Sequence, residues 1–123
     1  MAEQAKDGGP VDPAVSAYLE ALPDEHRTLF DRLHGLVTAA YPDATVGISY
    51  RMPTYRTGKR RLYIGSWAHG LSIYGWRQGG DAGFAARHPE LRSGKGTIRI
   101  RPQDGAGLTD AELIELVDAA LGG

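Results

Sequence analysis

Rings and guanidinium groups recur at every second residue in the middle of the sequence, the spacing that gathers side chains on one face of a β-sheet. The set expected on this face comprises Tyr63, Ser72, Tyr74, Trp76, Thr97, Arg99 and Arg101. Rings stack on flat ligands, and guanidinium groups donate paired hydrogen bonds to carboxylates and phosphates. The pattern therefore indicates a surface for a flat or anionic ligand. Cross-strand pairing on a solvated face, or a dimer interface, would give the same pattern.

The stretch Gly94-Lys95-Gly96-Thr97 looks at first like a phosphate-binding loop but lacks the required spacing. A P-loop needs G-x-x-x-x-G-K-[ST] after a strand, whereas here a glycine follows the lysine and a strand follows that glycine. We predict a turn that leads into the last strand. Lys95 and exposed backbone N–H groups of this turn could still contact an anion.

Neither a catalytic set nor a metal site can be assembled from spacing alone. The four histidines contain no i, i+4 pair, and no serine lies in a G-x-S-x-G context. If the protein is an enzyme, the candidates for donating or accepting a proton are Tyr50, His69 and Lys95, acting without a cofactor on a small anionic substrate. Carboxylates gather at Asp24 and Glu25, where the positive start of a helix also favours them.

Charge is distributed unevenly along a chain whose net charge is only −1. Residues 44–103 hold eleven basic and two acidic side chains, whereas the segments on either side are acidic. A basic sheet can pair with its own acidic helices through surface ion pairs. The slightly acidic overall balance argues against a nucleic-acid partner.

The elements that position these residues follow from periodicity. Apolar residues at helical spacing predict helices from Asp12-Pro13, from Asp24 to Pro42, and after a capping box at Thr109 to Glu112. Between them, residues alternate with a period of two, and Pro53 indicates a bend or an edge strand. We expect Leu62, Ile64, Leu71, Ile73, Ile98 and Ile100 to face the helices. This order predicts an α+β fold, with an antiparallel sheet of about five strands packed against N-terminal and C-terminal helices.

Length and composition limit the classes of protein further. The 123 residues fit one domain, which we place at residues 12–121 after a disordered tail at residues 1–11. The absence of cysteine excludes disulfides, thiolate metal sites and a cysteine nucleophile. No apolar run approaches the ~20 residues of a membrane helix, so we expect no membrane partner and a cytoplasmic location.

The segment Ile48-Ser49-Tyr50-Arg51-Met52-Pro53-Thr54-Tyr55 resembles the SYxMP signature of the YdhG/YdeI-like family, a domain of unknown function. Two further segments, 69–74 and 93–100, match the family in order, so the resemblance covers roughly residues 11–121. It implies a compact α+β domain with an antiparallel sheet. It also implies a small pocket near Tyr50, Met52, Pro53 and Lys95.

Some members of this family are labelled frataxin-like iron chaperones, which implies iron as a possible cargo. Frataxin-like iron binding relies on carboxylates without dedicated His or Cys ligands. By that resemblance Asp24, Glu25 and Asp31 are the candidate metal ligands in this sequence.

Together these observations give the hypothesis of a small binding protein for a small molecule or a metal. Tyr50, Met52 and Pro53 would shape the pocket, and Tyr74 and Trp76 would form an apolar wall. The basic residues Arg51, Lys95 and Arg99 would attract an anionic group, including an anionic iron chelate. The alternatives are the cofactor-independent enzyme described above and a module that dimerises through its aromatic sheet face.

Overall fold

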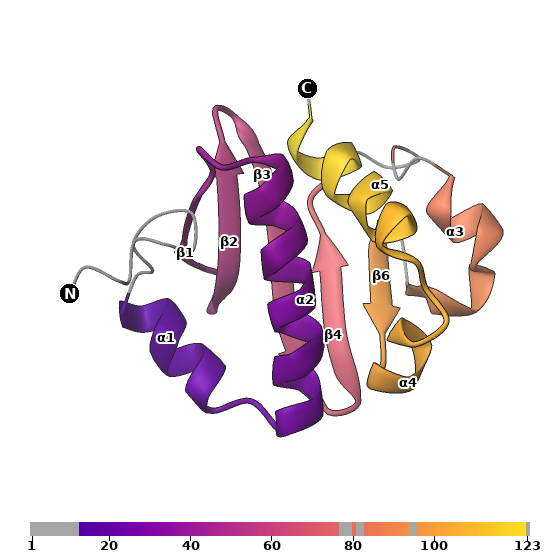
Figure 1. The fold of residues 1–123 in the computed structure, drawn as a ribbon, viewed down its shortest axis with the longest axis horizontal. Coiled ribbons are helices and arrows are strands. Elements are labelled where there is room, and N and C mark those ends of the chain that lie inside the picture. Colours follow the sequence, from indigo (N-terminus) through magenta and orange to yellow (C-terminus); the bar gives the residue numbers. More distant parts are fainter. Residues whose placement is uncertain (1–12, 77–79, 81–82, 94–95, 123) are drawn as a thin grey trace.

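The computed structural model describes residues 13–76, 80, 83–93 and 96–122. It confirms the α+β class: one open antiparallel sheet of six strands, covered on one face by helices from both ends of the chain (Figure 1). The strand order is β1-β2-β3-β4-β6-β5. Their bounds are β1 (Thr45–Ser49), β2 (Met52–Thr57), β3 (Arg60–Trp67), β4 (Gly70–Tyr74), β5 (Arg92–Ser93) and β6 (Thr97–Ile100).

Two long helices lie across the sheet, and shorter ones flank them (Figure 1). The helices are α1 (Pro13–Glu20), α2 (Asp24–Ala40), α3 (Phe84–Arg87), α4 (Pro102–Gly105) and α5 (Asp110–Leu121), with a 3₁₀ turn η2 (Pro89–Leu91). The predicted capping box begins α5: Glu112 N–H donates to Thr109 Oγ1 at 3.1 Å, and Thr109 N–H donates to Glu112 Oε1 at 3.1 Å. Two orphan donors at the helix start are thereby satisfied.

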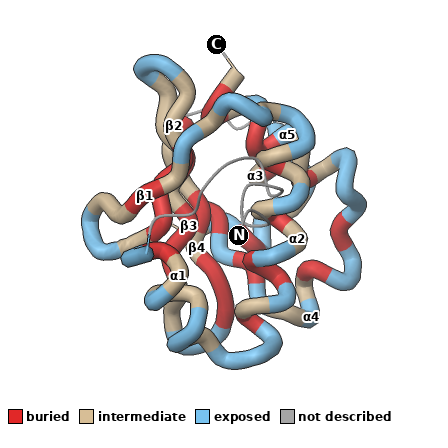
Figure 2. Tube along the Cα trace, turned by 60° about the vertical axis from the view of Figure 1, so that its left-hand side comes forward, coloured by how far each residue is buried: buried red, intermediate tan, exposed pale blue. Residues whose placement is uncertain are grey.

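The core lies between the helices and the sheet. Strand register places Tyr55 beside Leu62, Ile64 beside Ile73, and Leu71 beside Ile100, all on the face that meets α2 and α5. Each of the six residues predicted for this face is buried, which confirms the prediction. Phe30, Leu33, Val37, Leu113, Leu116 and Val117 complete the core from the helices. Figure 2 shows buried segments running along the strands.

Two glycines let strands approach where a side chain would collide. A Cβ on Gly70 would lie 2.3 Å from the backbone oxygen of Ile100, and one on Gly75 would lie 2.3 Å from that of Arg61. Gly75 also has φ of 139°, a conformation that strongly favours glycine. The period-two alternation of β4 therefore ends at Tyr74. Trp76 turns into the core and is only 8 % exposed, which corrects the prediction that it shares the outer face with Tyr74.

The C-terminal end of α5 is held by the β2–β3 hairpin. Arg60 donates from Nε to the carbonyl of Ala120 at 2.9 Å and from Nη2 to that of Ala119 at 2.8 Å. Thr57 Oγ1 donates to the carbonyl of Leu121 at 3.0 Å. These carbonyls have no partner within the helix, and a cation at this end also opposes the helix dipole.

Replacing Arg60 by methionine keeps most of the stem but removes this cap. We expect the free energy of unfolding, measured by urea titration, to fall by about 1–2 kcal/mol. Lys59→Met in the adjoining turn is the matched control, and we expect it to change stability by less than about 0.5 kcal/mol. Equal midpoints for the two variants would show that the cap contributes nothing.

Candidate functional site

The sheet face away from α2 and α5, here called the outer face, carries several of the ligand-binding candidates of the sequence. A two-residue turn connects β1 and β2 at one end of this face. Tyr50 and Arg51 form this turn with φ of 51° and 65°, between the paired residues Ser49 and Met52. A left-handed conformation at both central residues defines the tight hairpin turn that suits twisted strands. Tyr50 lies at the tip of the turn and is 79 % exposed.

Pro53 lies within β2, the second strand of the sheet, and neither bends the strand nor marks an edge as predicted. Because Ser49 and Met52 close the turn, the next pair, Ile48 and Pro53, exchanges no hydrogen bonds, and the proline nitrogen points toward β3. The β2–β3 ladder begins only at Thr54, so no ladder bond is lost. Pro53 is buried and, by alternation, faces the helices, whereas Met52 belongs to the outer face. The two therefore do not wall one pocket.

Tyr50, Met52, Tyr63 and Tyr74 form a continuous group on the outer face, which we call the tyrosine–methionine patch. The Tyr63 and Tyr74 rings stack with centroids 4.9 Å apart, and Tyr50 lies 5.9 Å from Tyr63 at a tilt of 54°. The Tyr74 hydroxyl donates to Met52 Sδ at 3.2 Å. Gly65 beneath gives the thioether room, since a Cβ there would lie 3.1 Å from the sulfur. Rings and sulfur thus present one polarizable surface.

Burial of the Tyr74 phenol raises its pKa, and the neighbouring phenols of Tyr63 and Tyr50 raise it further. The hydroxyl therefore keeps its proton throughout the neutral range. It remains available as a hydrogen-bond donor to an anionic or neutral acceptor.

Three arginines belong to the outer face or to the turn beside it. Arg56 donates from Nη2 to Ser49 Oγ at the β1 edge. At the other side, the guanidinium of Arg99 lies 4.6 Å above the Trp67 ring, in cation–π geometry. Arg51 extends from the turn and is exposed. We call Arg51, Arg56 and Arg99 the arginine rim.

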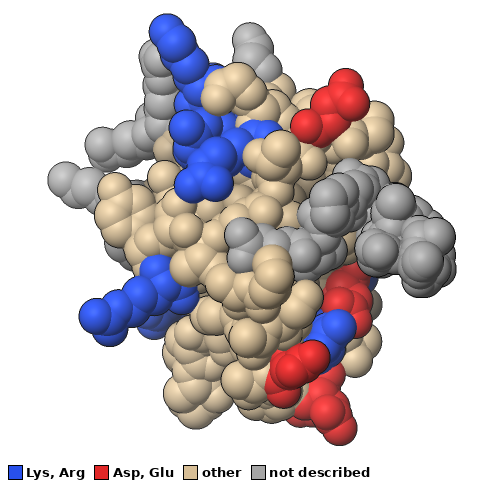
Figure 3. All heavy atoms as spheres, turned by 90° about the vertical axis from the view of Figure 1, so that its left-hand side faces the viewer, with Lys and Arg blue, Asp and Glu red and all other residues tan. Residues whose placement is uncertain are grey.

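No ion pair links the arginine rim to a carboxylate of the described residues. The pairs that do form lie on or beside the helices, as in Arg27–Asp31 at 3.1 Å and Arg32–Asp110 at 2.9 Å. In Figure 3 most Lys and Arg lie in the left half of the view, whereas Asp and Glu lie in the right half, on the side of the helices, with some basic atoms among them. The predicted pairing between sheet cations and acidic helices is therefore not seen for the rim among the described residues.

The carboxylates implied by the iron-chaperone resemblance do not meet in one place. Asp31 is engaged by Arg27, while Asp24 and Glu25 occupy the first turn of α2. Within the described part of the chain, no group of three or more His, Asp or Glu side chains could hold a metal ion.

The other residues predicted for the site do not all lie in the described part of the outer face. Lys95 lies outside the described residues. His69 is exposed in the β3–β4 turn, with its ring edge-on to Trp67 at 5.0 Å. Trp67 itself was not among the predicted site residues, although its spacing from Tyr63 in β3 places both on the same face. The structure thus brings together Tyr50, Met52 and Tyr74, with Arg51 and Arg99 nearby, and separates Pro53 and Trp76 from them.

None of the helices in the described ranges combines the length and apolar character of a bilayer-spanning segment. Comparison of the chain with protein-family models, with curated proteins and with solved structures found no match. Side-chain geometry alone therefore identifies the outer sheet face as the candidate site.

Proposed function

We propose that the protein is a non-enzymatic binding protein that holds a small, flat, anionic ligand on its outer sheet face. The observation that carries the proposal is the tyrosine–methionine patch bordered by arginines without carboxylate partners among the described residues. The proposal is also supported by the YdhG-like segment Ile48–Tyr55, because this hairpin supplies Tyr50, Arg51 and Met52.

Each part of the face has a distinct role in this proposal. Rings and thioether give contact area to a planar group, with little side-chain entropy to lose because the rings already pack on one another. The arginine rim supplies charge and paired donors to carboxylate or phosphate oxygens. If iron is the cargo, an anionic chelate fits this face, because the charge of the rim repels a free cation.

Calorimetric titration with probes of matched shape tests the proposal. Naphthalene-2-carboxylate is flat and anionic, 2-naphthalenemethanol is flat and neutral, and citrate is anionic without a flat ring. We expect the flat anion to bind at least tenfold more tightly than either of the others. Ferric citrate and ferrous iron, titrated separately, distinguish chelate binding from binding of the free ion.

Two variants locate the binding. We expect Arg99→Gln and Tyr74→Leu each to weaken naphthalene-2-carboxylate about tenfold, as the loss of one charged hydrogen bond or one stacking contact implies. Arg27→Gln on the helix side is the matched control and should change affinity less than twofold. Equal weakening by Arg27→Gln would contradict the proposal. So would a stable dimer in light scattering that Tyr74→Leu converts to a monomer, because the face would then be a subunit interface.

A further inference from the structure

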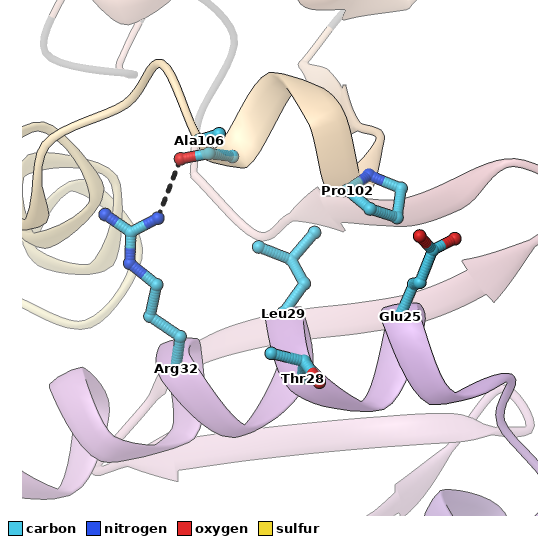
Figure 4. Close-up of a pocket in the computed structure, with 7 residues that line it drawn as sticks. Glu25, Thr28, Leu29, Arg32, Pro102 and Ala106 are labelled. Atoms are coloured by element: carbon cyan, nitrogen blue, oxygen red, sulfur yellow. Dashed lines mark hydrogen bonds between the residues drawn. The ribbon is translucent and has the colours of Figure 1, made fainter.

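A groove runs between the N-terminal half of α2 and residues 101–106, and Trp67 belongs both to its lining and to the outer face. The groove consists of two adjoining hollows that share Glu25 and Pro102. The first, of about 330 Å³, is lined in addition by Thr28, Leu29, Arg32, Gly105 and Ala106 (Figure 4). The second, of about 430 Å³, is lined in addition by His26, Trp67, Ala68, His69, Arg101 and Gln103. We call them the apolar hollow and the polar hollow.

The apolar hollow is closed at one end by Arg32, each of whose three side-chain nitrogens already donates one hydrogen bond. Arg32 donates from Nη1 to the carbonyl of Gly105 at 2.8 Å, from Nη2 to that of Leu108 at 2.7 Å, and from Nε to Asp110 at 2.9 Å. Leu29 lies between Arg32 at one end and Glu25 at the other (Figure 4). The space between the two ends is therefore bounded mainly by carbon.

The groove contains one carboxylate without a partner among the described residues, that of Glu25. The guanidinium of Arg101 is bound in two places by Asp104, at 3.0 and 3.1 Å, which lowers the pKa of that carboxyl and keeps the pair neutral as a unit. The Glu25 carboxylate, which is exposed to solvent where the two hollows meet, has no hydrogen-bond or ion-pair partner among the described residues. A carboxylate left without a partner beside a carbon-lined space is complementary to a cation that carries an apolar group.

We propose that this groove binds a small amine with an apolar chain, its ammonium group at Glu25 and its chain in the apolar hollow. The Trp67 and His69 rings also line the polar hollow, and the face of an aromatic ring attracts a cation. An anion of equal length would place its charge against Glu25. The volume of the apolar hollow lies within the range of small-molecule sites, about 300–1,000 Å³.

Titration of the uniformly ¹⁵N-labelled protein with hexylamine, hexanol and hexanoate, followed by NMR, tests the proposal. We expect hexylamine to shift the amide signals of Glu25, Gln103 and Ala106, and to bind at least tenfold more tightly than hexanoate. Glu25→Gln should weaken hexylamine at least tenfold. Asp24→Asn, one residue earlier in the same helix turn but lining neither hollow, should change affinity less than twofold.

A second variant tests where the alkyl chain of the amine binds and leaves the Glu25 carboxylate unchanged. Ala106 is exposed, so Ala106→Leu should fold normally while filling the apolar hollow. We expect it to abolish the preference for hexylamine over ethylamine and to leave ethylamine binding within twofold. Equal binding of hexanoate, no loss in Glu25→Gln, an equal loss in Asp24→Asn, or an unchanged chain-length preference in Ala106→Leu would each overturn the proposal.

Discussion

Replacing Gly70 by alanine is expected to lower the free energy of unfolding by about 3 kcal/mol. The added Cβ would lie 2.3 Å from the backbone oxygen of Ile100 and 2.8 Å from the Cα of Arg101. Both are backbone atoms at the end of β6, so the collision cannot be relieved by a change of rotamer. Relief requires moving β6 away from β4, which loosens the ladder that pairs Leu71 with Ile100. Urea unfolding followed by circular dichroism measures the loss.

Gly35→Ala provides a control of opposite sign. Gly35 lies inside α2, and a Cβ there would meet nothing within 4 Å. Alanine loses less conformational entropy than glycine in a helix, so this variant should gain about 0.5–1 kcal/mol. A Gly70→Ala variant as stable as the parent would show that β4 and β6 do not approach as closely as described.

The second large effect is an alkaline loss of stability that originates at Tyr55. This phenol is only 1 % exposed, and its burial raises its pKa, with a smaller contribution from the negative charge of Asp31. Above about pH 10 the unfolded chain loses this proton while the folded chain keeps it. Because the folded state then binds more protons, stability falls as pH rises, by about 1.4 kcal/mol per pH unit for this one group. Below about pH 10 the full contribution is present.

Urea unfolding at pH 8, 10 and 11 tests this expectation. Tyr55→Phe removes the ionisable group, so its stability should fall less steeply above pH 10 than that of the parent. At pH 8 it should be less stable by about 1 kcal/mol, because it lacks the hydrogen bond between the hydroxyl and His34 Nδ1 at 2.8 Å. Tyr41, whose pKa is raised to about 12 by burial and by its bond to Asp118, contributes in the same direction in both proteins, as does Tyr74, whose pKa is also raised.

The fold could be predicted largely because its sheet is buried on one face only. Alternation placed Ile64 and Ile73 toward the helices and Tyr63 and Tyr74 away from them, and the strand register agrees. The Tyr50–Arg51 turn could not be recognised, because glycine, asparagine and aspartate, the residues that usually signal such turns, are missing there. Pro53 in the sequence instead predicts a bend or an edge strand.

Long-range packing accounts for what the sequence did not reveal about the sites. The outer position of Tyr74 and Arg99 follows from local alternation, but a single glycine conformation at Gly75 sends Trp76 to the opposite side. The groove brings α2 against α4, which is more than sixty residues away in the chain. Nothing in the spacing around Glu25 indicates which residues will lie across from it.

The shortness of the Tyr50–Arg51 turn has a consequence for the speed of docking. Paired strand residues flank the turn on both sides, and a two-residue turn is too short to act as a mobile loop over the site. A molecule arriving at Tyr50 therefore meets a platform that is already assembled, and its capture is governed by encounter rather than by rearrangement. An open surface contacts only one side of a bound ligand. Chemically different ligands that share the same flat side would therefore compete for one binding site.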